Sequence, residues 1–211
     1  MNDLQQLQKH VINGETDSAR ELTQRLLDDG VAPETLLNEA LTLAMDEVGE
    51  LYERQEYFLP EMMASAQSMQ AAMTLLRPLL SEGGSQPAAT AILGTVKGDL
   101  HDIGKNIVGM MLEGAGLTVI DLGPDVAPET FVEAVKKHSP DILGMSALLS
   151  TTQPMMGTTI KVLEEAGVRD QVKVIIGGPP TSSTFAKQIG ADGYAPDASQ
   201  AVKKVRSLLD L

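Results

Sequence analysis

One segment near the middle of the chain constrains the fold more than any other. The apolar, β-branched run 90–96 is followed by a polar turn, 98–104, and then by residues 104–112, which have the pattern of a helix with one buried side. A strand, a turn and a helix in this order are typical of an open α/β sheet, in which ligands bind at the carboxyl edge of the strands. The turn contains His101, with Asp99 two residues before it. A histidine in such a turn can bind a metal, and an aspartate can hold its other ring nitrogen.

Three other interpretations of this turn are weaker. A phosphate-binding loop needs four residues between its glycines and a Ser or Thr after the lysine, but five residues separate Gly98 from Gly104, and Asn106 follows Lys105. A zinc site needs three or four ligands, mostly Cys and His, and the chain has no cysteine and only three histidines. A helix-capping turn is the default for a lone histidine, but it leaves the Asp-x-His spacing unexplained.

Beyond residue 88, strand-like apolar runs alternate with helical stretches. The predicted strands are residues 88–96, 118–122, 142–146, 173–176 and 193–195, and a last helix is predicted over 198–209. Strands separated by helices indicate a parallel sheet with helices on both faces.

The first part of the chain has helical periodicity throughout. Predicted helices cover residues 4–11 and 16–30, and two more begin near Pro33 and Pro60. Short connections between four helices favour a small antiparallel bundle. Residues 81–87 are rich in Gly and Ser and end in Pro, which predicts a flexible linker. We therefore expect a helical domain over residues 1–84 and an α/β domain over 85–211.

Composition limits the classes of partner. A formal net charge of −13 and a pI near 4.5 argue against nucleic acid or an anionic membrane as the main partner. The absence of cysteine excludes disulfides and thiol catalysis. The N-terminal residues lack the basic and apolar regions of a signal peptide, and no apolar run reaches the length of a membrane span. A soluble, cytoplasmic protein is expected.

Three segments carry a family resemblance. Asp99-x-His101-x-x-Gly104 resembles the Asp-x-His-x-x-Gly signature of the cobalamin-binding domains of methionine synthase, corrinoid methyl-carrier proteins and B12-dependent mutases. Residues 145–152 resemble the Ser-x-Leu segment after the third strand of that family, and residues 175–180 resemble its Gly-Gly segment after the fourth. Residues 96–108 are especially similar to the methionine synthase and methyl-carrier branch. The resemblance implies a flavodoxin-like five-stranded parallel sheet, preceded by a four-helix bundle that caps the cofactor.

The resemblance also implies roles for individual residues. His101 matches the histidine that replaces the cofactor's own base as lower axial ligand of cobalt, Asp99 matches the carboxylate that orients it, and Thr152 matches the hydroxyl that ends a proton relay. We expect these three to support catalysis. The implied cobalamin contacts in the α/β domain are Gly98, Asp99, Leu100, His101, Asp102, Ile103, Gly104, Ser146, Leu148, Ser150, Gly177, Gly178 and Ala198. In the cap, Phe58 and Met62 are the expected corrin contacts, although the methionines of this helix also fit a bundle core.

The function implied is that of a corrinoid methyl carrier, alternating between methylcobalamin and cob(I)alamin. A substrate-specific methyltransferase would load the methyl group from a methylamine, methanol, a methoxylated aromatic or a betaine. A second methyltransferase would pass it to tetrahydrofolate or a thiol, and a reductive activase is a further expected partner. The chain has no substrate pocket with its own acid and base, so it is not expected to be catalytic alone. The alternatives are the cobalamin-binding subunit of a B12-dependent mutase, which lacks such a cap, and a B12-based sensor, which needs an output module.

Overall fold

The computed structural model describes residues 2–82 and 89–211. The chain divides into two compact units: one comprises residues 1–87 together with 113–116, and the other comprises residues 88–112 and 117–211. Part of the predicted linker, residues 83–87, lies outside the described residues, and so does residue 88 of the first predicted strand. The described residues contain no helix that is both long enough and apolar enough to cross a bilayer.

The helical unit is built from the helices that the periodicity predicts. Its elements are α1 (Asp3–Ile12), α2 (Thr16–Asp28), α3 (Pro33–Leu36), the π-helical segment η1 (Leu37–Leu41), α4 (Thr42–Glu53) and α5 (Leu59–Glu82). The segments α3, η1 and α4 follow one another without a break and form the third of the four predicted helices. The long helix α5 begins one residue before Pro60 and includes Ser81 and Glu82, so the first two residues of the predicted linker are helical.

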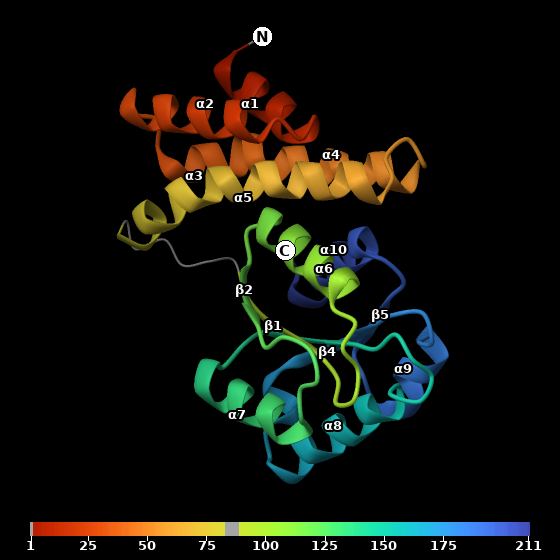
Figure 1. The fold of residues 1–211 in the computed structure, drawn as a ribbon. Helices are drawn as coiled ribbons and strands as arrows, with labels where there is room; N and C mark the ends of the chain where they lie inside the picture. The colour runs from red at the N-terminus through yellow and green to blue at the C-terminus, as the bar shows by residue number, and fades with distance from the viewer. Residues whose placement is uncertain (1, 83–88) are drawn as a thin grey trace. The chain divides into compact units, whose positions relative to one another are not determined.

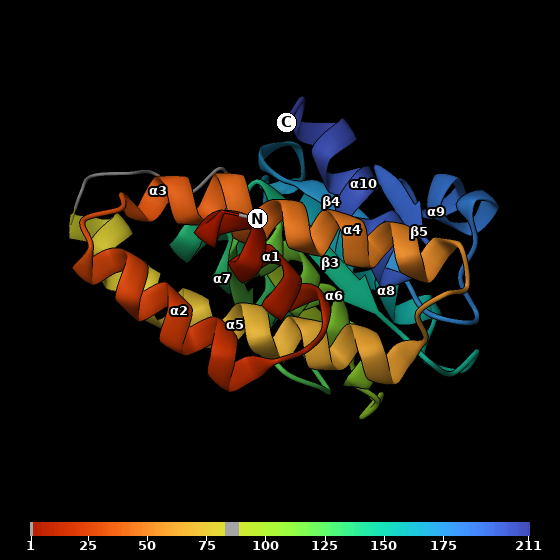
Figure 2. The same ribbon diagram turned by 90° about the horizontal axis from the view of Figure 1, so that it is seen from above.

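Apolar and polar contacts both join the helices of this unit. Three of the methionines in α5, Met62, Met69 and Met73, are buried, and Met63 is partly buried. Helices α2 and α5 lie side by side, as Figure 2 shows. The carbonyl of Ile12, at the C-terminal end of α1, accepts hydrogen bonds from the Tyr57 hydroxyl (3.1 Å) and the Ser65 hydroxyl (2.7 Å). These bonds satisfy a carbonyl that has no partner within its own helix.

The α/β unit is a five-stranded parallel sheet. Its strands are β1 (Thr90–Thr95), β2 (Thr118–Asp121), β3 (Ile142–Ser146), β4 (Lys173–Gly177) and β5 (Gly193–Ala195), in the order β2-β1-β3-β4-β5. This is the predicted flavodoxin-like order, with the reversal of strand order between β1 and β3. Strand β1 ends at Thr95, and Val96 forms only a single bridge, to Val126.

Helices cover both faces of the sheet. They are α6 (Ile103–Gly114), α7 (Pro128–His138), α8 (Pro154–Glu165), α9 (Ser183–Ile189) and α10 (Ala198–Leu209), with a 3-10 turn, η2 (Arg169–Gln171). Buried residues of α7, α8 and α9 share one apolar cluster with the strands. Helices α6 and α10 lie on the opposite face (Figure 1).

The strands are in register at their carboxyl ends. The last residues of β1, β3, β4 and β5 pair directly across the sheet, in the row Thr95, Ser146, Gly177 and Ala195. The segments that follow these strands therefore begin at one edge of the sheet, which is where open α/β folds bind ligands.

The packing between β1 and α7 predicts different effects for two glycine substitutions. A Cβ at Gly94 would lie 2.6 Å from Cε1 of Phe131, a side chain that is fully buried. We expect Gly94→Ala to lower the free energy of unfolding by about 1–3 kcal/mol, because the core has no space for the ring to move. Urea unfolding of the cofactor-free protein, followed by circular dichroism, measures this loss.

The matched control is Gly104→Ala, in the first turn of α6, because a Cβ at this position meets no atom within 4 Å. Alanine is also the better helix former, so this variant should be at least as stable as the unsubstituted chain. Equal stability of the two variants would contradict the close contact between Gly94 and Phe131.

Candidate functional site

A single carboxylate organises the carboxyl edge of the sheet. Asp99 is completely buried, and its Oδ1 accepts hydrogen bonds from the backbone N–H (3.1 Å) and the Nδ1 (2.8 Å) of His101. Its Oδ2 accepts from the backbone N–H groups of Leu148 (2.8 Å) and Leu149 (3.2 Å). The Thr152 hydroxyl donates a third bond to Oδ2, at 2.7 Å. Asp99 therefore joins the turn after β1 to the loop after β3.

These bonds determine the protonation of the pair. Burial by itself raises the pKa of the Asp99 carboxyl, but the hydrogen bonds from Thr152, His101 and the backbone outweigh it and hold that pKa well below its usual range. Asp99 is thus a carboxylate at neutral pH and can only accept hydrogen bonds. Nδ1 of His101 must then carry the proton that lies between the two residues, and a neutral ring presents the lone pair of Nε2 for a ligand.

The histidine suits a metal that brings most of its own ligands. The His101 side chain is 52% exposed, and no described residue bonds its Nε2. Within residues 2–82 and 89–211, no group of three or more His, Cys, Asp or Glu side chains is arranged to hold a metal ion. One exposed nitrogen fits a cobalt whose equatorial positions are filled by a corrin ring, and it does not fit a metal bound by protein ligands alone.

The surroundings of His101 are unusually apolar for a protein surface. Leu100 and Ile103, in and just after the turn, are 71% and 65% exposed, and Leu148 and Leu149 in the facing loop are also exposed. Large apolar side chains exposed together mark ligand or partner sites. The chain thus presents an apolar surface beside the free nitrogen of His101.

The loop after β4 approaches the loop after β3 very closely. Gly178 has a φ of +113°, and a Cβ there would lie 2.0 Å from the carbonyl oxygen of Ala147. Only glycine fits this position, because any side chain would collide with backbone. The pair Gly177–Gly178 therefore draws two backbone segments together beside the turn that contains His101.

The structure brings most of the predicted site residues to this edge. Residues 98–104 form the turn after β1 and the start of α6; Ser146, Leu148, Ser150 and Thr152 end β3 or follow it; Gly177 and Gly178 end β4 or follow it. Ala198 is the first residue of α10 and is buried, and this helix follows β5 after a short connection. That each of these residues contacts the cofactor stays a prediction.

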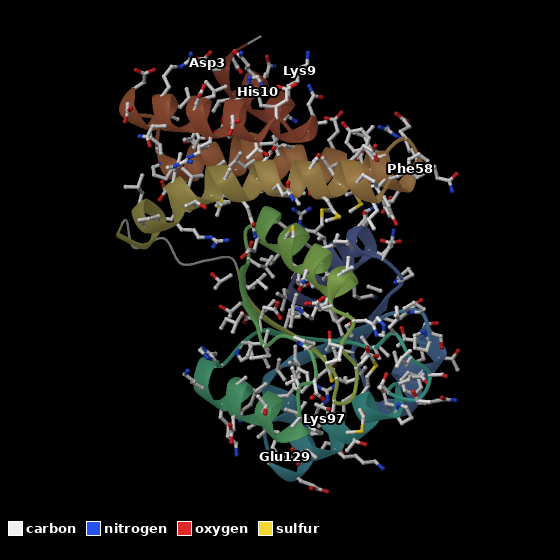
Figure 3. All side chains as sticks on the ribbon, in the orientation of Figure 1. Asp3, Lys9, His10, Phe58, Lys97 and Glu129 are labelled. Carbon is white, nitrogen blue, oxygen red and sulfur yellow. The ribbon has the colours of Figure 1, made fainter. Side chains whose placement is uncertain are left out.

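The two residues predicted for the cap lie in the helical unit and differ in exposure. Phe58 is 62% exposed and precedes α5, and Figure 3 shows it at the end of the connection from α4. Met62 is only 1% exposed and is one of the buried methionines of α5. An exposed ring is free to meet a ligand, whereas Met62 would need a rearrangement of its neighbours. Both contacts stay predictions.

Two acidic residues near the turn were not predicted. Asp125, at a φ of +55°, accepts a hydrogen bond from the backbone N–H of Gly98 (2.8 Å), and this bond and the Lys97 ammonium lower its pKa. Asp121 pairs with the buried Lys105, whose Nζ lies 2.6 Å from both carboxylate oxygens. The only sequence signal for Asp125 is its place in the turn-like Gly-Pro-Asp run 123–125.

The hydroxyl of Thr152 should contribute measurably to stability. We expect Thr152→Val to lower the free energy of unfolding by about 1–2 kcal/mol, because Asp99 loses one hydrogen bond while its backbone donors remain. The matched variant Thr152→Ser keeps the hydroxyl and loses one methyl group, so its cost should be less than about 1 kcal/mol. Urea unfolding of the cofactor-free protein tests both variants, and a larger loss for Ser than for Val would contradict this role of the hydroxyl.

Known proteins resemble the chain over nearly its whole length. Two family models, each described as a B12 binding domain, match residues 89–203 and 3–77. Dimethylamine corrinoid protein 1 of Methanosarcina acetivorans is 42% identical over 207 residues, which is 98% of this chain and 97% of that protein.

Two solved structures show the same likeness. A cobalamin-binding protein from Desulfitobacterium hafniense has a TM-score of 0.81 at 32% identity, covering 99% of both chains. The methanol:cobalamin methyltransferase complex of Methanosarcina barkeri contains a chain with a TM-score of 0.84 at 31% identity, covering 97% of this chain and 78% of that one. The chain belongs to the family of corrinoid proteins built on a B12 binding domain, and its cofactor is cobalamin.

Proposed function

We propose that this protein carries a methyl group on the cobalt of bound cobalamin between two methyltransferases. The observation that supports this most directly is the pair formed by Asp99 and His101. It places one oriented ring nitrogen beside an apolar surface. When bound, cobalamin supplies a cobalt centre that accepts a methyl group and gives it up again.

The residues of the chain then have defined tasks. His101 would bind cobalt through Nε2, while Asp99 holds the proton on Nδ1 and fixes the plane of the ring. Thr152 holds the second oxygen of Asp99. Leu100, Ile103, Leu148 and Leu149 would exclude water around the bond between His101 and cobalt. Phe58 stays a proposed corrin contact from the helical unit.

The relatives favour a methylated amine as the first donor to test. The relative with 42% identity is named a dimethylamine corrinoid protein, whereas the chain from the methanol:cobalamin methyltransferase complex is 31% identical. We propose that a methyltransferase for such an amine loads the carrier, and that a second methyltransferase unloads it to tetrahydrofolate or a thiol. A reductive activase would restore oxidised cobalt.

The ligand assignment predicts a spectroscopic change. Electron paramagnetic resonance of the Co(II) form should show superhyperfine splitting that changes when nitrogen-15 is placed in the protein histidines. In His101→Gly this isotope effect should vanish, while cobalamin still binds because contacts away from cobalt remain. His138→Gln is the matched control, because this histidine ends α7 on the surface. A persisting isotope effect in His101→Gly would overturn the assignment.

The carrier role predicts that transfer depends on a partner. Transfer of a methyl group from an amine needs activation of the leaving nitrogen, and we propose that the partner methyltransferase supplies this activation. The holoprotein alone should therefore not demethylate dimethylamine, and a cognate methyltransferase should methylate its cobalt. The absorbance spectrum of the corrin follows this step. Multiple turnovers by the purified chain alone would show that it is a free-standing enzyme.

A further inference from the structure

The connection from β2 to α7, residues 122–127, runs alongside the turn that contains His101. The backbone N–H of Thr95 donates to the carbonyl of Gly123 (3.0 Å), and the N–H of Val126 donates back to the carbonyl of Thr95 (2.9 Å). The pairing of β1 with this segment thus continues past the end of β2. This brings Asp125, which lies between these two bonds in the chain, to the ligand turn.

Asp125 bonds the backbone on both sides of the Gly98–Asp99 dipeptide, at the peptide groups that precede Gly98 and follow Asp99. Its carboxylate oxygen Oδ1 accepts the N–H of Gly98 at 2.8 Å, and its own N–H donates to the carbonyl of Asp99 at 2.9 Å. Lys97 adds an exposed ion pair, with its Nζ 3.1 Å from Oδ1. The N–H of Asp99 is held separately by the carbonyl of Val96 (3.1 Å). Both the N–H and the carbonyl of Asp99 are therefore hydrogen-bonded to backbone, independently of the bonds that its side chain makes.

The conformation of Asp125 has no explanation in core packing. The residue adopts a left-handed φ of +55°, which Asp, Asn and Gly tolerate far better than other residues, and its side chain is 41% exposed. Unusual backbone conformations persist where the surrounding structure requires them, and they cluster at functional sites. The left-handed conformation here lets one residue present both its N–H and its carboxylate to the same turn.

We propose that Asp125 is a positioning residue for cobalt ligation by His101. By fixing the backbone of Gly98 and Asp99, Asp125 determines where the Asp99 carboxylate lies. That carboxylate in turn bonds Nδ1 of His101, and it thereby determines the position and the plane of the imidazole. This inference rests on the proposed role of His101 as the cobalt ligand.

Three substitutions separate the elements of this role. Asp125→Gly keeps the left-handed backbone and removes the acceptor. Asp125→Asn keeps both the conformation and an acceptor oxygen, and loses only the charge. Lys97→Ala removes the exposed ion pair alone. Asp210→Gly is the matched control, because Asp210 has the same φ of +55° at the C-terminal end of α10.

The first readout uses the cofactor-free protein and hydrogen exchange measured by NMR. In Asp125→Gly the amide of Gly98 should exchange about tenfold faster, since it loses a charged acceptor. The amides of His101 and Leu148, which bond to Asp99 and not to Asp125, should also exchange several-fold faster. A purely local role would change Gly98 and leave these two amides as they are. Asp125→Asn, Lys97→Ala and Asp210→Gly should leave them unchanged.

The second readout is the Co(II) resonance spectrum of the holoprotein with nitrogen-15 histidine. Asp125→Gly should lower the fraction of cobalt ligated by His101 at least threefold, without lowering the amount of cobalamin bound per chain. Asp125→Asn and the two control variants should keep the unsubstituted fraction.

Several results would overturn the proposal. The first is that the amides of His101 and Leu148 exchange no faster in Asp125→Gly than in the unsubstituted protein. The second is that the fraction of cobalt ligated by His101 is the same in that variant. A third needs no variant, because an unprotected Gly98 amide in the unsubstituted protein would show that the bond to Asp125 does not hold the turn. If the unsubstituted holoprotein shows no histidine ligation, the proposed function fails instead, and the exchange experiment still decides whether Asp125 positions Asp99.

Discussion

The buried carboxylate of Asp99 is the constraint on which the rest of the site depends. Removing a carboxylate from water is costly unless its oxygens are fully hydrogen-bonded, and Asp99 meets this requirement with bonds from His101, Leu148, Leu149 and Thr152. These donors come from the segments after β1 and β3, which are neighbours at the point where the strand order reverses. The ionised carboxylate can therefore be buried only if both loops are in place, and the hydrogen bond that orients His101 forms in the same arrangement.

The local sequence pattern predicts the strands of the sheet and most of the helices. It does not predict the segments in which the backbone hydrogen bonding is irregular. Strands β3 and β5 and helix α10 begin and end where the sequence indicates. Pro140 lies just before β3, Asp197 caps the N-terminus of α10, and short apolar runs define the length of the two strands. The π-helical segment Leu37–Leu41 has no such signal. One wider turn of helix leaves the apolar spacing before and after it almost unchanged, so the periodicity predicts an ordinary helix there.

The site shows the same division between local and distant information. The pair Asp99 and His101 was predictable because two residues in one turn can meet without help from the rest of the fold. Thr152 was identified only through the family resemblance, since 53 residues separate it from Asp99. The backbone donors Leu148 and Leu149 have no side-chain signal at all, because any residue supplies an N–H group. Asp125 could not be assigned from sequence for a related reason: its contact with the turn exists only once β1 and the segment after β2 are paired.

A threonine at position 152 suits the geometry around its hydroxyl. That hydroxyl lies 2.7 Å from Oδ2 of Asp99 and 3.0 Å from the carbonyl of Leu149, yet it has a single proton to donate. The charged oxygen is the closer and the stronger acceptor, so the Thr152 hydroxyl donates its hydrogen bond to Asp99. A β-branched side chain has fewer accessible rotamers than serine, and it loses less entropy when it is held in this one. Threonine therefore supplies the same hydrogen bond from a stiffer side chain, which suits a carboxylate whose position determines the plane of the His101 imidazole.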